Sequence, residues 1–159
     1  MIRQLLILFI ILSLFGCNYS SEKQASDSSI SVDKMTLSEV KDLLKLMKQN
    51  DQQYRDSLYN GNKRNIDFYT QKITETDKVN LALLDKIIQK FGWPTISTFG
   101  NEGAETAFLI IWHHGSKRNI LCKYFDLMEA AVKNKEMNQN CFKDIQERIT
   151  QLSPDQIEY

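Results

Sequence analysis

Apolar residues recur three and four positions apart along most of the chain, which is the spacing of one face of an α-helix. The first such stretch starts at Thr36-Leu37-Ser38-Glu39, a capping box that predicts a helix start. Its end is predicted near Asn60-Gly61-Asn62, a turn signal. The apolar stripe of this helix consists of Leu37, Val40, Leu44, Met47, Tyr54 and Leu58. Asp51 interrupts the stripe, so a carboxylate takes a position that the spacing assigns to the core.

A second helix is predicted from about Arg64 to Phe91. Its inward positions are Ile66, Tyr69, Ile73, Leu84, Ile87 and Phe91. Asp77 and Asn80 fill the middle of this stripe, so it too is polar at its centre. Alternatively, the helix breaks near Thr74, which would make Asp77 an ordinary capping residue. Gly92-Trp93-Pro94 predicts the helix end, because Gly closes a helix and Pro prevents it from resuming.

The third helix is the most apolar, and we expect it at the centre of the fold. It is predicted from about Glu102 to His114, after a polar link that reaches Gly100, with Asn101 as its N-cap. Every residue from 107 to 112 is apolar, so both sides of this helix favour burial.

Two further helices are predicted, one from about Lys117 to Lys133 and one after a polar link that ends at Gln139. Their inward residues are Leu121, Tyr124, Leu127, Met128 and Ala131 in the fourth helix and Phe142, Ile145, Ile149 and Leu152 in the fifth. No stretch alternates with a period of two. The prediction is therefore an all-α fold, a bundle of about five helices with mostly antiparallel neighbours.

The N-terminus carries the features of an export signal. Arg3 precedes the apolar run Leu5 to Leu12, which is too short for a permanent membrane span. The run leads into Gly16-Cys17, which resembles the lipobox of bacterial lipoproteins. That resemblance implies that residues 1–16 are a signal peptide and that Cys17 is lipidated, for example with palmitate. The alternative is an uncleaved membrane helix with an incidental Cys.

The residues after Cys17 are rich in Ser, Asp, Lys and Gln, so residues 17–34 are predicted to be a flexible tether and residues 35–159 the helical domain. The expected location is the bacterial cell envelope, on the exported side of a membrane. Loss of Arg3 with the signal peptide leaves 19 positive residues against 20 negative ones. This near-neutral balance, without a basic run among aromatics, argues against nucleic-acid binding.

Cys122 and Cys141 remain in the predicted domain, and export permits a disulfide. A hairpin near Glu136 would however place Cys122 roughly 21 Å from the turn, at about 1.5 Å per residue. A disulfide needs Cα atoms within about 7 Å. We therefore expect two buried free thiols.

The polar residues inside the apolar stripes are the candidate site. If neighbouring helices are antiparallel, then Asp51, Asp77, Asn80 and one of His113 or His114 lie at one height of the bundle. Arg55 follows Asp51 by one helical turn and can form an ion pair with it. The candidate ligand-binding residues are Asp51, Arg55, Asp77, Asn80, His113 and Arg148.

Three interpretations of this set stay open. The residues can form a satisfied network, with Asp51 paired to Arg55 and Asp77 to Arg148. They can line a ligand pocket. They can also serve catalysis, with Asp77 and His113 as acid–base or metal-binding groups. The sequence contains no zinc-type His spacing, nucleophile motif or phosphate loop, so no cofactor or metal is predicted.

From about Leu43 onward the chain resembles a bacterial family catalogued as domain of unknown function 6624. The resemblance is carried by an ordered set: Asp51-Gln52 with Arg55, Asp77, Asn80, Gly92-Trp93-Pro94, Gly100, Gly103-Ala104-Glu105, Ala107, His113, the run from 127 to 132, and Glu147-Arg148. It implies that the polar residues belong to a family pattern and that His113, rather than His114, faces the interior. The family brings no activity that can be assigned here.

The chain departs from that pattern at three places. Trp112 and Leu121 stand where the family has Gln, and the C-terminal motif is reduced to Ile157-Glu158-Tyr159. These departures favour binding or a structural role over catalysis. The leading hypothesis is a membrane-tethered helical binding domain, with an unknown small molecule or envelope protein as its partner. The alternatives are a hydrolase-type enzyme and a purely structural domain.

Overall fold

The structure is a computed structural model and describes residues 30–61 and 65–153. Within these residues it consists of helices and contains no strand, which confirms the all-α prediction. The elements are η2 (Val32–Lys34, a 3₁₀ helix), α1 (Leu37–Asn60), α2 (Ile66–Phe91), α3 (Ile96–His113), α4 (Arg118–Lys133) and α5 (Gln139–Gln151). None of the described helices is long and apolar enough to cross a membrane. The predicted signal peptide, Cys17 and most of the predicted tether lie outside the described residues.

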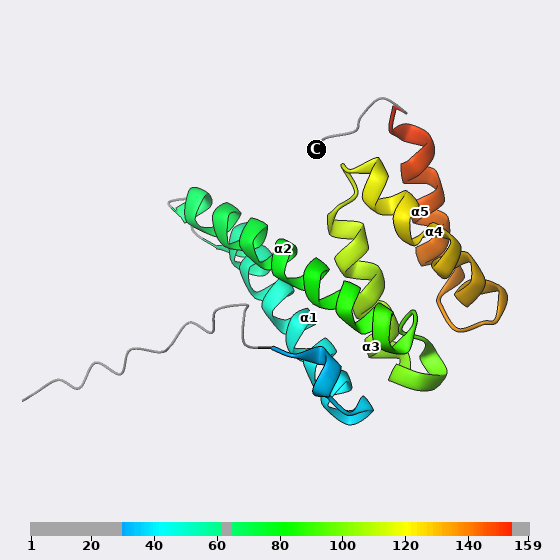
Figure 1. Cartoon of the computed structure of the whole chain (residues 1–159). Coiled ribbons are helices and arrows are strands. Elements are labelled where there is room, and N and C mark those ends of the chain that lie inside the picture. The colour runs from blue at the N-terminus through cyan, green and yellow to red at the C-terminus, as the bar shows by residue number, and fades with distance from the viewer. Residues whose placement is uncertain (1–29, 62–64, 154–159) are drawn as a thin grey trace, which may run out of the picture.

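Helix α3 lies between the α1–α2 hairpin and the α4–α5 pair (Figure 1). It packs against α1, α2 and α4. Its buried side chains, which include Ala104, Ala107, Phe108, Ile110 and Ile111, point in several directions around the helix axis. This is why the stretch that is apolar on every side occupies the centre.

The start of α1 follows the predicted capping box. The Thr36 hydroxyl accepts from the backbone N–H of Glu39 at 3.3 Å, and the Glu39 carboxylate accepts from the backbone N–H of Thr36 at 2.7 Å. Val40, Leu44 and Met47 then face the core. Local sequence therefore determines where α1 begins and which face it buries.

The start of α3 differs from the prediction. Gly92 ends α2 with φ of 77°, as expected, but α3 begins at Ile96 rather than near Glu102. Glu136, from the α4–α5 connection, accepts hydrogen bonds from the backbone N–H groups of Ile96 and Ser97. This distant residue caps the extra turn. The polar link is thus helical, and Gly100 (φ 78°) interrupts the helix inside it.

The folded domain begins earlier in the chain than predicted. Residues 32–34, which the sequence assigned to the tether, form η2, and Val32 is 1 % exposed. The Lys90 ammonium donates to the carbonyls of Val32, Asp33 and Met35 at 3.2, 2.7 and 2.7 Å. The C-terminal end of α2 therefore holds this segment onto the domain.

Three residues predicted to face inward are exposed: Leu37, Ile66 and Leu127. Ile66 is the first residue of α2. At that end of the α1–α2 hairpin no third helix lies alongside (Figure 1). In α4 the buried residues Leu121, Tyr124, Met128 and Ala131 form a stripe narrower than predicted. Leu127 lies beside that stripe and reaches solvent.

Both cysteines of the domain are free, as predicted, but they are not fully buried. Cys122 is exposed, because it follows the buried Leu121 and points about 100° away from it around the helix. Cys141 is half-buried beside α3.

Candidate functional site

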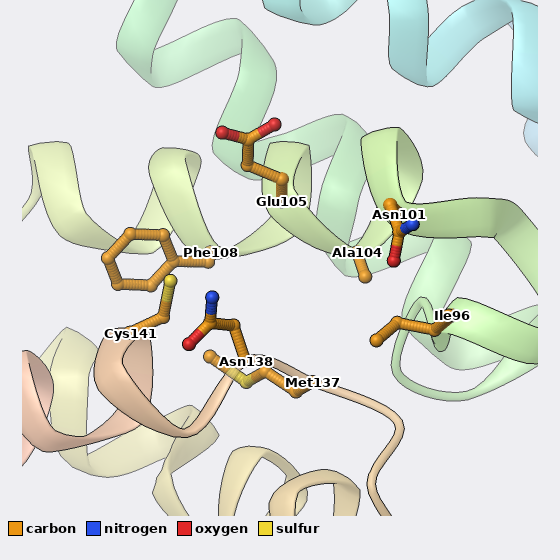
Figure 2. Close-up of a pocket in the computed structure, with 8 residues that line it drawn as sticks. All are labelled: Ile96, Asn101, Ala104, Glu105, Phe108, Met137, Asn138 and Cys141. Atoms are coloured by element: carbon orange, nitrogen blue, oxygen red, sulfur yellow. The ribbon is translucent and has the colours of Figure 1, made fainter.

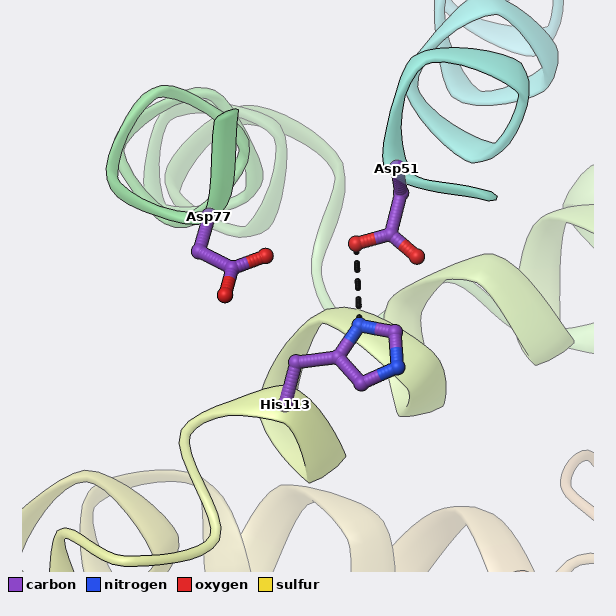
Figure 3. Close-up of side chains that lie close together, drawn as sticks. All are labelled: Asp51, Asp77 and His113. Carbon is purple, nitrogen blue, oxygen red and sulfur yellow. Dashed lines mark hydrogen bonds and ion pairs between the residues drawn. The ribbon is translucent and has the colours of Figure 1, made fainter. Parts of the chain in front are cut away.

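Side chains from three helices meet where α3 ends. Asp51 of α1, Asp77 of α2 and His113 of α3 point toward one another (Figure 3). The Nδ1 atom of His113 lies 2.9 Å from Oδ1 of Asp51. Asp51 is only 4 % exposed, because it occupies an inward position of the apolar stripe of α1. The expected convergence of these three residues is therefore present.

Arg55 joins the two carboxylates. Its Nη2 atom donates to Oδ1 of Asp51 at 3.4 Å and also to Oδ1 of Asp77. Gln52 donates to the other oxygen of Asp51 at 2.5 Å. Gln52 was not among the predicted site residues, since it lies beside the stripe and its direction depends on where Asp51 points.

The surroundings of Asp51 favour its ionised form. Burial opposes ionisation, but the hydrogen bond from His113 and the electrostatic influence of His113 and Arg55 outweigh it, so the pKa of Asp51 lies below its usual value of 3.8. An ionised carboxylate only accepts hydrogen bonds. The Nδ1 atom of His113 must therefore carry the proton that it donates, and Nε2 lies on the side of the ring away from Asp77 (Figure 3).

Part of this network borders a cleft between α2 and the α3–α4 connection. The cleft has a volume of about 500 Å³ and is lined by Thr74, Asp77, Lys78, Leu81, His113, His114, Ser116, Lys117 and Ile120. The Nδ1 atom of His114 donates a hydrogen bond to the backbone carbonyl of Ile110 at 2.9 Å. The two histidines therefore have different partners, since His113 contacts Asp51. Asp51 forms the buried base of the network, while Asp77 and His113 reach the cleft.

Asn80 belongs to the packing between α1 and α2. It is 3 % exposed, and its amide donates to the carbonyl of Met47 at 3.3 Å. It also lines a separate groove of about 300 Å³ beside Tyr54 and Lys72. Asn80 therefore lies at the predicted height, but its hydrogen bond is to the α1 backbone.

Arg148 lies elsewhere in the bundle. Its guanidinium carbon lies 5.4 Å from the ring centroid of Trp112, and it lines a small cleft of about 130 Å³ on α5. The predicted pair between Asp77 and Arg148 is wrong, because Arg55 takes that position. Arg55 reaches Asp77 across the α1–α2 hairpin, and Arg148 is held against the aromatic ring instead.

The network contains carboxylate and imidazole side chains, which are ligands for divalent cations in proteins. One potential ligand atom from each of Asp51, Asp77 and His113 lies within 4.8 Å of the others. However, Oδ1 of both carboxylates already accepts from Arg55. A cation that used those atoms would have to displace the guanidinium, which already supplies a positive charge there.

A second cavity, of about 220 Å³, lies between α3 and the start of α5 (Figure 2). Ala104, Phe108 and Met137 form buried apolar walls, and the Cys141 thiol reaches its edge. Burial, with the nearby charges of Asp144 and Glu105, raises the pKa of Cys141, which makes its thiolate scarce at neutral pH. The sequence contains no signal for this cavity, because its walls come from segments far apart in the chain.

Comparisons with protein-family models, curated proteins and solved structures found no match for this chain. The family resemblance drawn from the sequence therefore stays a prediction, as does a ligand-binding role for the residues described above.

Proposed function

We propose that this chain is a lipid-anchored protein of the bacterial cell envelope whose helical domain binds a small molecule or an envelope protein in the cleft beside Asp77 and His113. The observation that carries the binding role is a charged network from three helices that opens onto a cleft of about 500 Å³. Clefts with a few converging polar groups are typical of binding sites. The location rests on Arg3, the apolar run Leu5 to Leu12, and Cys17.

The cleft offers groups that the fold itself leaves available. Lys78 and Lys117 line it, and no ion pair holds either side chain within the described part of the chain. Asp77 uses Oδ1 for Arg55. A ligand with an acidic or carbonyl group for the lysines and a donor for Asp77 would match these side chains.

Thermal melts of two variants test the binding role against a structural one. Asp51→Asn should lower the melting temperature clearly, because Asp51 is buried and bonded to three side chains. Asp77→Asn should change it little if Asp77 serves a ligand, since ligand sites are not optimised for stability. Glu129→Gln, in an exposed pair with Lys133, is the matched control. Equal losses for Asp77→Asn and Asp51→Asn would make the network structural.

Metabolic labelling with a palmitate analogue tests the anchor. The wild-type chain should incorporate the label and fractionate with membranes. Cys17→Ala should lose the label. A labelled Cys17→Ala chain, or an unlabelled wild-type chain, would remove the lipoprotein assignment.

We also propose membership of the family catalogued as domain of unknown function 6624. Support comes from the ordered motif set, and from the fact that four of its positions, Asp51, Arg55, Asp77 and His113, form one network.

The second candidate function is a hydrolase-type enzyme, in a metal-dependent or a metal-independent form. It is favoured by the closeness of Asp51, Asp77 and His113, and by the carboxylate that orients the His113 ring. Metal analysis of purified protein, with melts in the presence of a chelator, tests the metal form. Stoichiometric metal and a lower melting temperature with chelator would support it, and the absence of both would exclude it.

A further inference from the structure

The cavity of about 220 Å³ between α3 and the start of α5 is separate from the network around Asp51 (Figure 2). Ala104, which lines it, precedes His113 by nine residues, or roughly 14 Å along α3. The cavity and the cleft beside His113 share no lining residue. A ligand in the cavity would therefore be independent of the function proposed for the cleft.

The inner wall of the cavity is apolar. Ala104, Phe108 and Met137 line it, and each is at most 8 % exposed. A buried water needs about two to four polar partners. These side chains offer only the thioether of Met137, which is a weak acceptor. Water would be held poorly against this wall, and an apolar group that displaces such water gains affinity.

Small side chains border the cavity on two sides. Ala104 lines it from α3 and Cys141 from α5 (Figure 2). Neither side chain is long enough to fill a space of about 220 Å³. An apolar cavity of about 150 Å³ can take up benzene. The space between α3 and α5 therefore has room for one ring that carries a substituent.

The side chains of the wall favour an aromatic ring over an aliphatic one. The sulfur atom of Met137 can make a favourable contact with a ring edge, and Phe108 can pair with a second ring. Phe108 itself stacks on Trp112, with ring centroids 6.0 Å apart, which holds it in place. Burial raises the pKa of the Cys141 thiol, so this side chain adds a small, uncharged surface.

Two exposed amides stand at the rim of the cavity, Asn101 from α3 and Asn138 from the start of α5. The Oδ1 atom of Asn138 accepts from the backbone N–H of Asn140 at 2.8 Å, which leaves its NH₂ group available. The Asn101 side chain has no hydrogen bond within the part of the chain that the structure describes. The amides can thus donate to a ligand and accept from it.

The rim is unfavourable for an anion. Its acidic residue, Glu105, is paired with Lys48 at 2.7 Å. Among the residues that line the described cavity there is no Lys, Arg or His. A charged group placed here would lose hydration without gaining an oppositely charged partner.

We propose that this cavity binds a neutral aromatic compound that has one ring and one uncharged polar group, such as an amide. The ring would lie against Phe108 and Met137, and the polar group would reach Asn101 and Asn138. Volume selects the size of the ligand, the wall selects its ring, and the rim selects its polar group.

Protection of Cys141 from alkylation tests the proposal in the full chain. Benzamide is the probe, and benzoate, which has nearly the same shape but carries a negative charge, is the matched compound. Iodoacetamide is added in mildly alkaline buffer, because the pKa of the Cys141 thiol is raised. Peptide mass spectrometry follows the alkylation of Cys141 and of Cys122, which is exposed on α4 and serves as the internal control.

Benzamide should slow the alkylation of Cys141 severalfold and leave that of Cys122 unchanged, while benzoate should have little effect on either. No slowing at Cys141, or equal slowing at both cysteines, would overturn the proposal. Equal protection by benzoate would overturn the neutral ligand class. Alkylation of Cys141 that slows with protein concentration alone would assign the cavity to a second copy of the chain, and would overturn the proposal too.

A substitution that fills the cavity provides the second test. Ala104→Leu should abolish the protection of Cys141 by benzamide, whereas Ala82→Leu, the same change at an exposed position of α2, should retain it. Full protection in Ala104→Leu would contradict binding in the cavity.

If Ala104→Leu does not fold, Cys141→Leu narrows the cavity from the side of α5, and Cys122→Leu is its control. Ligand-observed NMR should then detect benzamide bound to Cys122→Leu and much less bound to Cys141→Leu. Equal binding to both variants would overturn the proposal. None of these results depends on the lipid anchor or on a ligand in the cleft.

Discussion

Asp51 shows how one residue can connect three helices. It accepts from Arg55 on its own helix and from His113 on α3, and Arg55 in turn reaches Asp77 on α2. A carboxylate at an inward position of a helix needs such partners, because an unpaired buried charge is strongly destabilising. The acidic residue at an inward position of the apolar stripe therefore correctly indicated a polar network.

Replacement of Asp51 by Ala should lower the free energy of unfolding by about 3 kcal/mol, since the change leaves Arg55 and His113 in a buried site without their acceptor. Urea denaturation measures this loss. The double variant Asp51→Ala with Arg55→Ala should recover part of the stability. Strict additivity of the two changes would contradict a coupled network.

The stability that Asp51 contributes should depend on pH in the acid range. Its folded pKa is lower than the ordinary value of 3.8, so the contribution is complete well above pH 3.8 and is lost as pH falls through the folded pKa. The difference in unfolding free energy between wild type and Asp51→Asn should thus shrink as the pH falls below 3.8. A difference that persists in full far below pH 3.8 would contradict the ionised state of Asp51.

At the scale of elements, α3 is divided at Gly100, which has φ of 78° and ψ of 172°. This conformation is essentially restricted to glycine. Gly100→Ala should therefore cost about 1 to 3 kcal/mol of unfolding free energy. Asn101→Ala, one residue later and exposed, is the control and should have little effect. Equal stability of Gly100→Ala and wild type in urea would mean that the break can be rearranged without strain.

The contact between α2 and α4 predicts an unusual tyrosine. The Tyr124 hydroxyl donates to Asp85 at 2.6 Å, and burial together with this bond raises the pKa of Tyr124 to about 12. Tyrosinate absorbance should show one group that titrates near pH 12 and is absent in Tyr124→Phe. Because the folded pKa is above the ordinary value of 10, the stability from this bond is complete below pH 10 and is lost toward pH 12.

At the scale of the whole molecule, the N-terminal segment closes one end of the domain. Val32 is buried beneath α2, and Lys90 binds the carbonyls around it. Val32→Ala should lower the unfolding free energy by roughly 1.5 kcal/mol, at about 0.8 kcal/mol for each buried methylene-sized group lost. Asp33→Ala is the control, because Asp33 is exposed and its side chain forms no ion pair within residues 30–61 and 65–153. An unchanged urea midpoint for Val32→Ala would show that the segment adds nothing to the core.

The sequence alone determined the helical elements, the capping box of α1, the end of α2 and the three residues that converge at the site. Each depends on signals a few residues apart: apolar periodicity, a cap, or a glycine before a proline. Asp51, Asp77 and one of His113 or His114 could be placed at one height because short connections force neighbouring helices to be antiparallel, and only the family resemblance selected His113. The lipid anchor, the cleft's ligand and the family stay predictions.

Only the tertiary structure decided which partners meet. Arg55 rather than Arg148 pairs with Asp77, Glu136 caps the first turn of α3, and Val32 joins the core. These choices depend on side chains from distant segments that compete for one position in space, which periodicity along a single helix does not encode. For the same reason Ile66 follows a core pattern and is nevertheless exposed, since burial needs a facing helix as well as an apolar stripe.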